Sequence, residues 1–241
     1  HLSVHDVHVA FFHAPIDELI VVIPPRGLRR EGYLWQLKKA MYGTRKAAQS
    51  WQEFVAGVFR ENGWRRIAVA AGVYYEPMLD ITSAIHGDDL INEGEEESLD
   101  ILDQQLALHM DVKCIGRLGP DGVKEIKYLK RTIYWTTEGF HWVGDGRHID
   151  RAVELLELQD AKPAETPGSK ATGKGMRDSL EELPHAEAKL FQQVAGILNY
   201  VAIDRPDIQY SVKVILTDMS KPLIISMLRA KRCVRYLMGK R

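Results

Sequence analysis

The residues with the clearest chemical potential in this 241-residue chain are two adjacent aspartates, Asp88 and Asp89, in the segment SAIHGDDLINEG. Two short apolar runs flank them, so a hairpin formed by these runs would place both carboxylates at its turn. Adjacent carboxylates repel each other unless a cation neutralises them, and hard oxygen ligands suit Mg²⁺, above all when substrate phosphates complete its coordination. Asp and Gly also favour turns for purely conformational reasons, which is the commoner meaning of this dipeptide alone.

A third carboxylate, Asp6, interrupts an apolar segment that resembles a strand, VHDVHVAFF. A charged residue seldom occupies a buried strand position without a role. If Asp6 converges with Asp88 and Asp89 at one sheet edge, the three form the minimal ligand set for two-metal phosphoryl or nucleotidyl transfer, with ions about 3.5–4 Å apart. The sequence thus predicts a fold in which these carboxylates meet.

The overall charge indicates no partner, because 32 basic residues face 33 acidic ones. The distribution is uneven: residues 38–66 hold seven basic and two acidic residues, and residues 213–241 hold eight basic and one acidic. Basic blocks on helices can contact nucleic-acid phosphates, although either block alone is more often a solvated helix face.

The composition excludes several classes of protein. No apolar run approaches about 20 residues, so we expect no membrane span and no membrane partner. Two cysteines rule out a disulfide scaffold and favour a reducing compartment. The absence of an initiator Met and of a secretory signal, together with the basic end at Lys240 and Arg241, suggests a piece of a longer product.

The elements that must position the aspartates have α+β character. Strands are predicted over residues 1–12, 19–23, 72–76, 81–85 and 90–92, with a hairpin joining 125–135 to 139–143. Helices are predicted over residues 46–62, 98–110, 148–158, 185–202, 206–219 and 222–238. A polar linker occupies about 162–183. Mixed strands and helices followed by helices alone predict two domains, 1–145 and 146–241.

Six segments, in order and at compatible spacing, carry a resemblance to a known family. They are DVHVAFFHAPIDELIVVIPPRG, LKKAMYGTRKAAQSW, IHGDD, AKPAETP, VAGILNYVAIDRPDIQYSV and AKRCVRYLMGKR. Each resembles the corresponding motif of the reverse transcriptases of copia-type retrotransposons, and together they span nearly the whole chain. Any one would be weak, but six in the right order are highly specific.

The resemblance implies an RNA-directed DNA polymerase with the right-hand polymerase fold. Residues 1–145 would form partial fingers and a palm built on an antiparallel sheet, and residues 146–241 an all-helical thumb-like region. The expected partners are an RNA or DNA template with its primer, deoxynucleoside triphosphates, and the rest of the retroelement polyprotein, including integrase and RNase H. An upstream fingers segment would precede His1, and RNase H would follow Arg241.

The resemblance also assigns roles to residues. Asp6, Asp88 and Asp89 would bind two Mg²⁺ ions, or Mn²⁺, with the backbone carbonyl of Val7. Ala10 would lie under the triphosphate, Phe11 at the steric gate against ribonucleotides, and Gly43 beside the incoming nucleotide. Without the family, Phe11 would be read as ordinary core. The residues expected to contact nucleic acid are Lys38, Lys39, Arg45, Lys46, Arg229, Lys231, Arg232 and Arg235.

The chain departs from the family motifs at positions that bear on nucleotide positioning and primer grip. His86 replaces a Tyr two residues before the paired aspartates, and Lys46 and Ala48 replace a Gln and a Pro. Lys130 occupies the place of a Gly in the primer-gripping hairpin.

Two other functions fit part of this pattern. One is a retroelement remnant that binds nucleic acid without catalysis. The other is a nuclease with carboxylate-held metals, which explains the aspartates but not the helical motifs near the C-terminus.

Three further patterns are not expected to be sites. GSKATGKG at residues 168–175 nearly matches a phosphate-binding loop, but Gly175 replaces the required Ser or Thr and no strand precedes it. The histidines near the N-terminus alternate faces of a strand and lack a cysteine, so zinc is not expected. Cys114 and Cys233 have no Cys or His at ligand spacing, which predicts inert packing.

Overall fold

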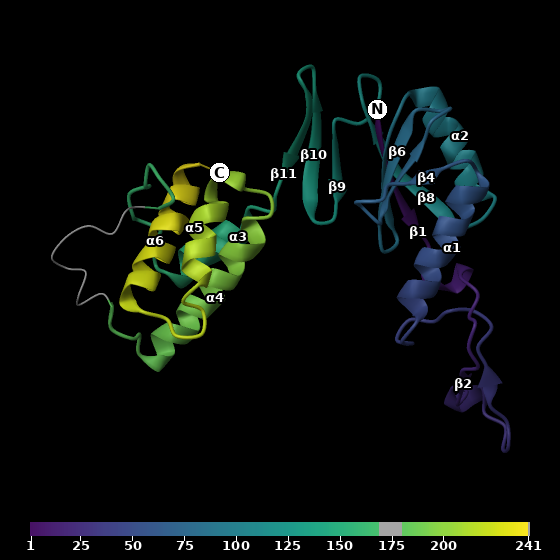
Figure 1. Cartoon of the computed structure of the whole chain (residues 1–241), viewed down its shortest axis with the longest axis horizontal. Coiled ribbons are helices and arrows are strands. Elements are labelled where there is room, and N and C mark those ends of the chain that lie inside the picture. The colour runs from purple at the N-terminus through teal and green to yellow at the C-terminus, as the bar shows by residue number, and fades with distance from the viewer. Residues whose placement is uncertain (169–179, 241) are drawn as a thin grey trace. The chain divides into compact units, whose positions relative to one another are not determined.

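The computed structural model describes residues 1–168 and 180–240, and its contacts divide the chain into two units, residues 1–142 and 143–241 (Figure 1). We call them the sheet unit and the helical unit. Most of the GSKATGKG segment lies outside the described residues. No helix in the described residues is long and apolar enough to cross a membrane.

A six-stranded antiparallel sheet forms the centre of the sheet unit, in the order β4-β5-β6-β7-β1-β8. In chain order its strands are β1 (Leu2–Val7), β4 (Arg65–Arg66), β5 (Val73–Glu76), β6 (Ile81–His86), β7 (Asp89–Glu93) and β8 (Val112–Leu118). β1 therefore lies between two strands that come much later in the chain. No strand was predicted over β8.

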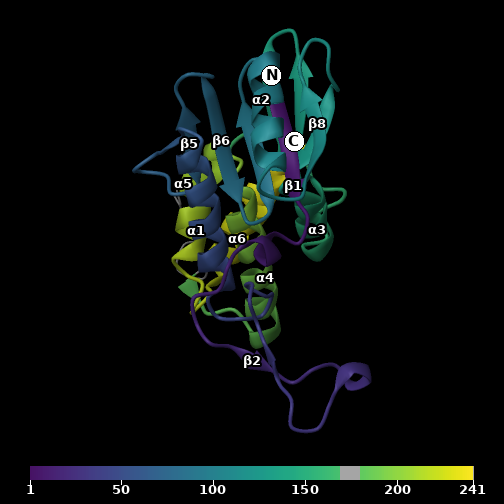
Figure 2. The same cartoon turned by 90° about the vertical axis from the view of Figure 1, so that its right-hand side faces the viewer.

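Two helices, α1 (Ala47–Glu61) and α2 (Glu96–Ala107), cover one face of this sheet (Figure 2). The apolar stripe predicted for the first helix is the buried face of α1, where Trp51, Val55 and Phe59 pack with Val7 of β1. Gly63 has a φ of +90°, a conformation that glycine adopts without strain, and it lets the chain turn away from α1.

The other face of β1 packs against a three-stranded sheet of β9 (Glu125–Tyr128), β10 (Arg131–Thr136) and β11 (Gly139–Val143). The sequence predicted one continuous strand over 125–135, and this is wrong. Leu129 and Lys130 have φ values of +47° and +63°, and Tyr128 pairs with Arg131. These two residues form a tight turn of the primed type, which splits the segment into β9 and β10.

The predicted N-terminal strand ends early, because Val9 adopts a left-handed conformation that turns the chain into the 3₁₀ helix η1 (Ala10–His13). Beyond η1 an arm carries the short pair β2 (Val21–Val22) and β3 (Trp35–Gln36), with the 3₁₀ helix η2 (Arg26–Leu28) between them. Large apolar side chains are exposed along this arm, among them Leu19, Ile23 and Tyr33.

The described part of the helical unit is built from α3 (Arg147–Leu155), α4 (His185–Val201), α5 (Pro206–Leu216) and α6 (Ile224–Gly239). They share one buried core that includes Phe191, Ile208 and Val234. The predicted α+β class with an antiparallel sheet is confirmed by these elements, whereas the palm, fingers and thumb assignments stay predictions.

Candidate active site

Strand pairing brings two of the three predicted carboxylates together, and the third directly precedes one of them. Asp6 of β1 and Asp89 of β7 are register partners, so their side chains lie on the same face of the sheet. His86 pairs with Asp89 across β6 and β7, which leaves Gly87 and Asp88 as a two-residue loop. Gly87 has a φ of +66°, as the first loop position of such a hairpin requires. We call β6, this loop and β7 the aspartate hairpin.

The loop is also tied to the strand that carries Asp6. The backbone N–H of Val7 donates to the carbonyl oxygen of Asp88 at 2.9 Å. Val7 itself is buried against α1, so this bond connects the loop to the core of the sheet unit.

The electrostatics of the site follow from this proximity. Partial burial raises the pKa of Asp89, the charges of Asp88 and Asp6 raise it further, and His86 opposes them. Burial and the charge of Asp89 also raise the pKa of Tyr128 to about 12. Tyr128, from β9, packs in one cluster with Val4 of β1 and Ile91 of β7, on the face of the sheet that carries Asp6 and Asp89. The carboxylate oxygens of the three aspartates do not all lie within 4.8 Å of one another. The ligand atoms of another cluster, described below, do.

A buried tryptophan holds the aspartate hairpin from beneath. The indole N–H of Trp51, from α1, donates to the carbonyl oxygen of Gly87 at 2.6 Å, and only 2% of Trp51 is exposed. Sequence reasoning missed this contact, because the position of Trp51 in the helical stripe indicated only core packing. Its place at the end of the motif LKKAMYGTRKAAQSW was the available signal.

The residues predicted to surround the nucleotide lie on two adjacent segments. Phe11 is half-buried and stacks on Tyr42, with ring centroids 4.3 Å apart. Gly43 follows with a φ of +88° and open space around the position of a Cβ. Ala10 is fully buried. The structure thus brings Phe11 and the segment at Gly43 together, with Ala10 directly before Phe11, and their roles around the nucleotide stay predictions.

The backbone just before η1 is strained. Val9 has φ and ψ of 46°, and a β-branched residue in this left-handed region is a true outlier. Such strain concentrates at functional sites, because the surrounding structure must hold it in place. Here it directs the chain from Asp6 to Phe11 within one tight turn.

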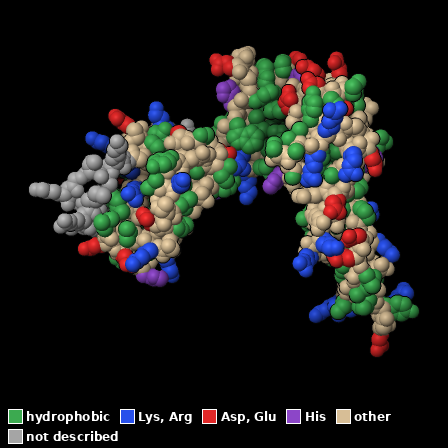
Figure 3. All heavy atoms as spheres, viewed as in Figure 1, with side chains coloured by type: hydrophobic (Ala, Val, Ile, Leu, Met, Phe, Trp, Pro, Cys, Tyr) green, Lys and Arg blue, Asp and Glu red, His purple; other side chains and the backbone are tan. Residues whose placement is uncertain are grey.

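The basic residues near α1 differ in their availability. Lys38 and Arg45 are exposed. Lys39 donates to the carbonyl oxygen of His13 at 2.8 Å, and Lys46 forms ion pairs with Asp17 and Glu18 at 3.6 and 3.7 Å. Figure 3 shows Lys and Arg side chains interspersed with acidic ones over the visible face.

The basic residues of α6 make contacts within the helical unit. Arg232 donates to the hydroxyl of Thr166 at 2.8 Å, and Arg235 donates to the carbonyl oxygen of Lys162 at 2.6 Å. Arg229 lies 3.6 Å from a carboxylate oxygen of Asp218. Lys231 is half-buried. Two of the four predicted nucleic-acid residues on α6 therefore fasten residues 162–166 to the helix.

The two cysteines, for which the sequence predicts inert packing, differ in their surroundings. Cys114 has no histidine near it in the sequence, but in the structure it is the register partner of His5 across β1 and β8. Cys233 is buried in the core of the helical unit, as predicted.

Comparison with known proteins shows which family the sequence of this chain matches. Residues 1–170 match the model of the family described as reverse transcriptase (RNA-dependent DNA polymerase). The chain is 27% identical to the putative transposon Ty5-1 protein of Saccharomyces cerevisiae, over 96% of this chain and 74% of that protein. It is 25% identical to the retrovirus-related Pol polyprotein from transposon TNT 1-94 of Nicotiana tabacum, over 97% of this chain but only 18% of the polyprotein. The corresponding protein from transposon RE1 of Arabidopsis thaliana is 22% identical, over 97% of this chain and 16% of that protein.

Proposed function

Because the chain belongs to the reverse transcriptase family, we propose that it catalyses RNA-directed DNA synthesis at the sheet edge formed by Asp6, Asp88 and Asp89. The observation that carries this proposal is the pairing of Asp6 with Asp89 in the register of β1 and β7. That pairing places Asp6 and Asp89, from distant parts of the sequence, on one face of the sheet, and Asp88 directly precedes Asp89 in the loop. Two-metal nucleotidyl transfer needs such a group.

The residues fit the divalent ions that this reaction uses. The raised pKa of Asp89 arises partly from the charges of Asp88 and Asp6, and a bound cation would relieve this repulsion. Carboxylate oxygens and a backbone carbonyl are hard ligands of the kind that Mg²⁺ prefers. Asp6, Asp88, Asp89 and the carbonyl of Val7 would hold two Mg²⁺, or Mn²⁺. When bound, the ions would neutralise the charge that develops as the primer 3′-hydroxyl attacks the α-phosphate.

The chain's own residues would select and orient the nucleotide. The ring of Phe11 would contact the sugar C2′ and disfavour ribonucleotides, and its stacking on Tyr42 would hold it in position. Ala10 would form the floor under the triphosphate. Gly43 would let the backbone approach the nucleotide, since the space around it is open.

Template and primer would be held largely by charge. In the sheet unit Lys38 and Arg45 are exposed and suited to phosphate contacts, with Lys39 and Lys46 beside them. In the helical unit the corresponding candidates are Arg229, Lys231, Arg232 and Arg235, although Arg232 and Arg235 also fasten residues 162–166.

Primer extension on an RNA template, with Mg²⁺ or Mn²⁺, tests the proposal. The double variant Asp88→Asn/Asp89→Asn should lose synthesis, whereas Asp121→Asn, which changes an exposed carboxyl between β8 and β9, should retain it. Template binding without extension by the unaltered chain, under both ions, would favour the remnant that binds nucleic acid without catalysis. Metal-dependent strand scission would favour the nuclease.

A further inference from the structure

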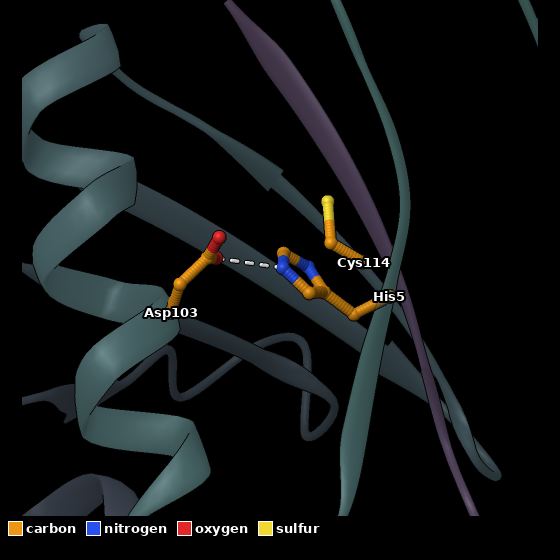
Figure 4. A group of neighbouring side chains, drawn as sticks. All are labelled: His5, Asp103 and Cys114. Carbon is orange, nitrogen blue, oxygen red and sulfur yellow. Dashed lines mark hydrogen bonds and ion pairs between the residues drawn. The ribbon is translucent and has the colours of Figure 1, made fainter.

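A second cluster of ligand-type side chains lies on the opposite face of β1 from Asp6, beneath α2. His5, Asp103 and Cys114 come from β1, α2 and β8, and one ligand atom from each lies within 4.8 Å of the other two (Figure 4). In the described parts of the chain, this is the one group of three His, Cys, Asp or Glu side chains that is so close.

The strand β8 is irregular at the point that brings Cys114 into this space. Its register against β1 shifts, so that Ile115 has no partner while Cys114 pairs with His5 and Arg117 pairs with Ser3. A regular strand would place residues three positions apart on opposite faces, but the bulge puts Cys114 and Arg117 on the same face. Bulges often re-aim side chains in this way beside functional sites.

The groups around the cluster already orient its ligands. His5 is only 1% exposed, and its Nε2 is hydrogen-bonded to Oδ1 of Asp103 at 2.7 Å. Arg117 donates to the other oxygen of Asp103 at 2.8 Å, so the carboxylate presents one oxygen to the histidine. The bond from Arg117 is an outer hydrogen bond of the kind that commonly holds a metal-binding carboxylate, whereas the bond between His5 and Asp103 joins two candidate ligand atoms and would open on metal binding.

Asn92 supplies the remaining contact to His5. Its Nδ2 lies 3.0 Å from Nδ1 of His5, while its buried Oδ1 has no hydrogen-bond partner. Turning the amide over would let Oδ1 accept the Nδ1 proton. Nε2 would then be free of its proton, as a metal ligand must be.

The surroundings of the thiol do not favour nucleophilic reactivity. Partial burial of the sulfur and the charge of Asp103 raise the pKa of Cys114, and reactive cysteines need the opposite shift. A metal ion can nevertheless displace the thiol proton, because thiolate coordination stabilises the deprotonated form.

We propose that Nε2 of His5, Oδ1 of Asp103 and Sγ of Cys114 bind one Zn²⁺, with solvent as the fourth ligand. Imidazole, carboxylate and thiolate together suit Zn²⁺, whereas the sulfur ligand disfavours Mg²⁺. Tetrahedral bonds of about 2.0–2.3 Å hold ligand atoms roughly 3.3–3.7 Å apart. The contact between His5 and Asp103 therefore opens by less than an ångström, and the proton of the Cys114 thiol leaves to solvent.

This ion would bind at the back of the proposed active site. It would join α2 to β1 and β8, and His5 immediately precedes Asp6 in β1. Zinc would thus stabilise the sheet unit without contacting the nucleotide, and this site stands independently of the proposed polymerase activity.

Cobalt substitution tests the site directly. Co²⁺ is titrated into the whole chain in excess Mg²⁺, which occupies carboxylate-only sites, and the absorption spectrum is recorded. We expect one Co²⁺ per chain, a near-ultraviolet band from charge transfer between thiolate and cobalt, and loss of the band when Zn²⁺ is added. Zn²⁺ should also raise the melting temperature.

Three variants complete the experiment. Cys114→Ser changes an exposed side chain, so it should leave the fold intact, abolish the band and weaken Zn²⁺ binding at least tenfold. Cys233→Ala and Asp88→Asn/Asp89→Asn should both keep the band. A chain without the band, or a band that survives Cys114→Ser or disappears in Cys233→Ala, would overturn the proposal.

Discussion

Replacing Trp51 with Phe tests whether the indole N–H positions the aspartate hairpin. The substitution keeps an aromatic ring in the core and removes the hydrogen bond to the carbonyl of Gly87. Trp64 offers a matched control, because it lies in the same core cluster and its indole N–H donates elsewhere, to Gln105 at 3.4 Å.

The structure sets the expected loss of stability. A lost hydrogen bond costs about 0.5–1.5 kcal/mol. The smaller ring costs about 1–2 kcal/mol more, compared with about 3–5 kcal/mol for full truncation to Ala. A hollow of about 70 Å³ borders Trp51 and Gly87, so we expect water to hydrate the freed carbonyl and the larger penalty of a buried, unpaired acceptor not to apply. Trp51→Phe should lose about 1.5–3.5 kcal/mol, and Trp64→Phe should fall in the lower half of that range, because its hydrogen bond at 3.4 Å is the weaker one.

The rate of primer extension should differ between the two variants more than their stabilities do. Misplacing a reacting group by about 1 Å can lower a rate about 10²-fold. Trp51→Phe should therefore reduce primer extension by about 10–100-fold at a temperature where it is fully folded, and it should weaken the stabilisation by Mn²⁺. Trp64→Phe should stay within about twofold of the unaltered chain.

Urea unfolding gives the stability of each variant, and single-nucleotide extension gives the rate. Equal rate losses in the two variants would show that general core packing, not the Gly87 hydrogen bond, controls the site. A Trp51→Phe variant with normal extension and normal metal stabilisation would refute the positioning role outright.

Three further predictions concern the site and its surroundings. Because the pKa of Asp89 is raised in the folded chain, stability falls as pH rises above the ordinary carboxyl pKa of 3.8. Asp89→Asn should therefore melt higher than the unaltered chain at pH 7 in EDTA, and the difference should shrink near pH 3 or with Mg²⁺; a lower melting temperature at pH 7 would contradict this. Lys130→Gly should stabilise the chain by roughly 0.5–1 kcal/mol in urea unfolding, because glycine adopts the positive φ of +63° without strain. Lys127→Gly, within β9, should destabilise the chain by a similar amount. Phe11→Ala should lower the ratio of deoxynucleotide to ribonucleotide incorporation, and Tyr42→Ala, which removes the ring that holds Phe11 in position, should lower it less; an unchanged ratio in folded Phe11→Ala would assign Phe11 to packing alone.

The parts of the site predicted from sequence are those that depend on short-range patterns. Asp88 and Asp89 lie between two apolar runs, and this arrangement predicts a hairpin whose turn exposes both. The stripe of α1 follows the helical period, so its buried face was also predicted. The pairing of Asp6 with Asp89 could not be predicted from such patterns alone, because the register between distant strands depends on which of their faces are buried.

The features that escaped prediction depend on local exceptions to those patterns. β8 contains a bulge at Ile115 that breaks the alternation of a strand. The turn between β9 and β10 uses Leu129 and Lys130, where glycine or asparagine would have signalled a turn. The direction of the Trp51 indole is set by tertiary packing, and helical spacing contains no information about it.

The placement of β1 has a consequence for how the chain acquires its structure. Within the described residues β1 pairs with β7 and β8 alone, and both strands are formed by residues 89–118. During synthesis at about 5–20 residues per second, its backbone stays unpaired for several seconds while the intervening chain emerges. Helix α1 and the hairpin of β5 and β6 involve local contacts and can form within that interval. The strand that carries Asp6 therefore joins the sheet late, and a chaperone that shields residues 2–7 would raise the yield of folded chain more than one that shields α1.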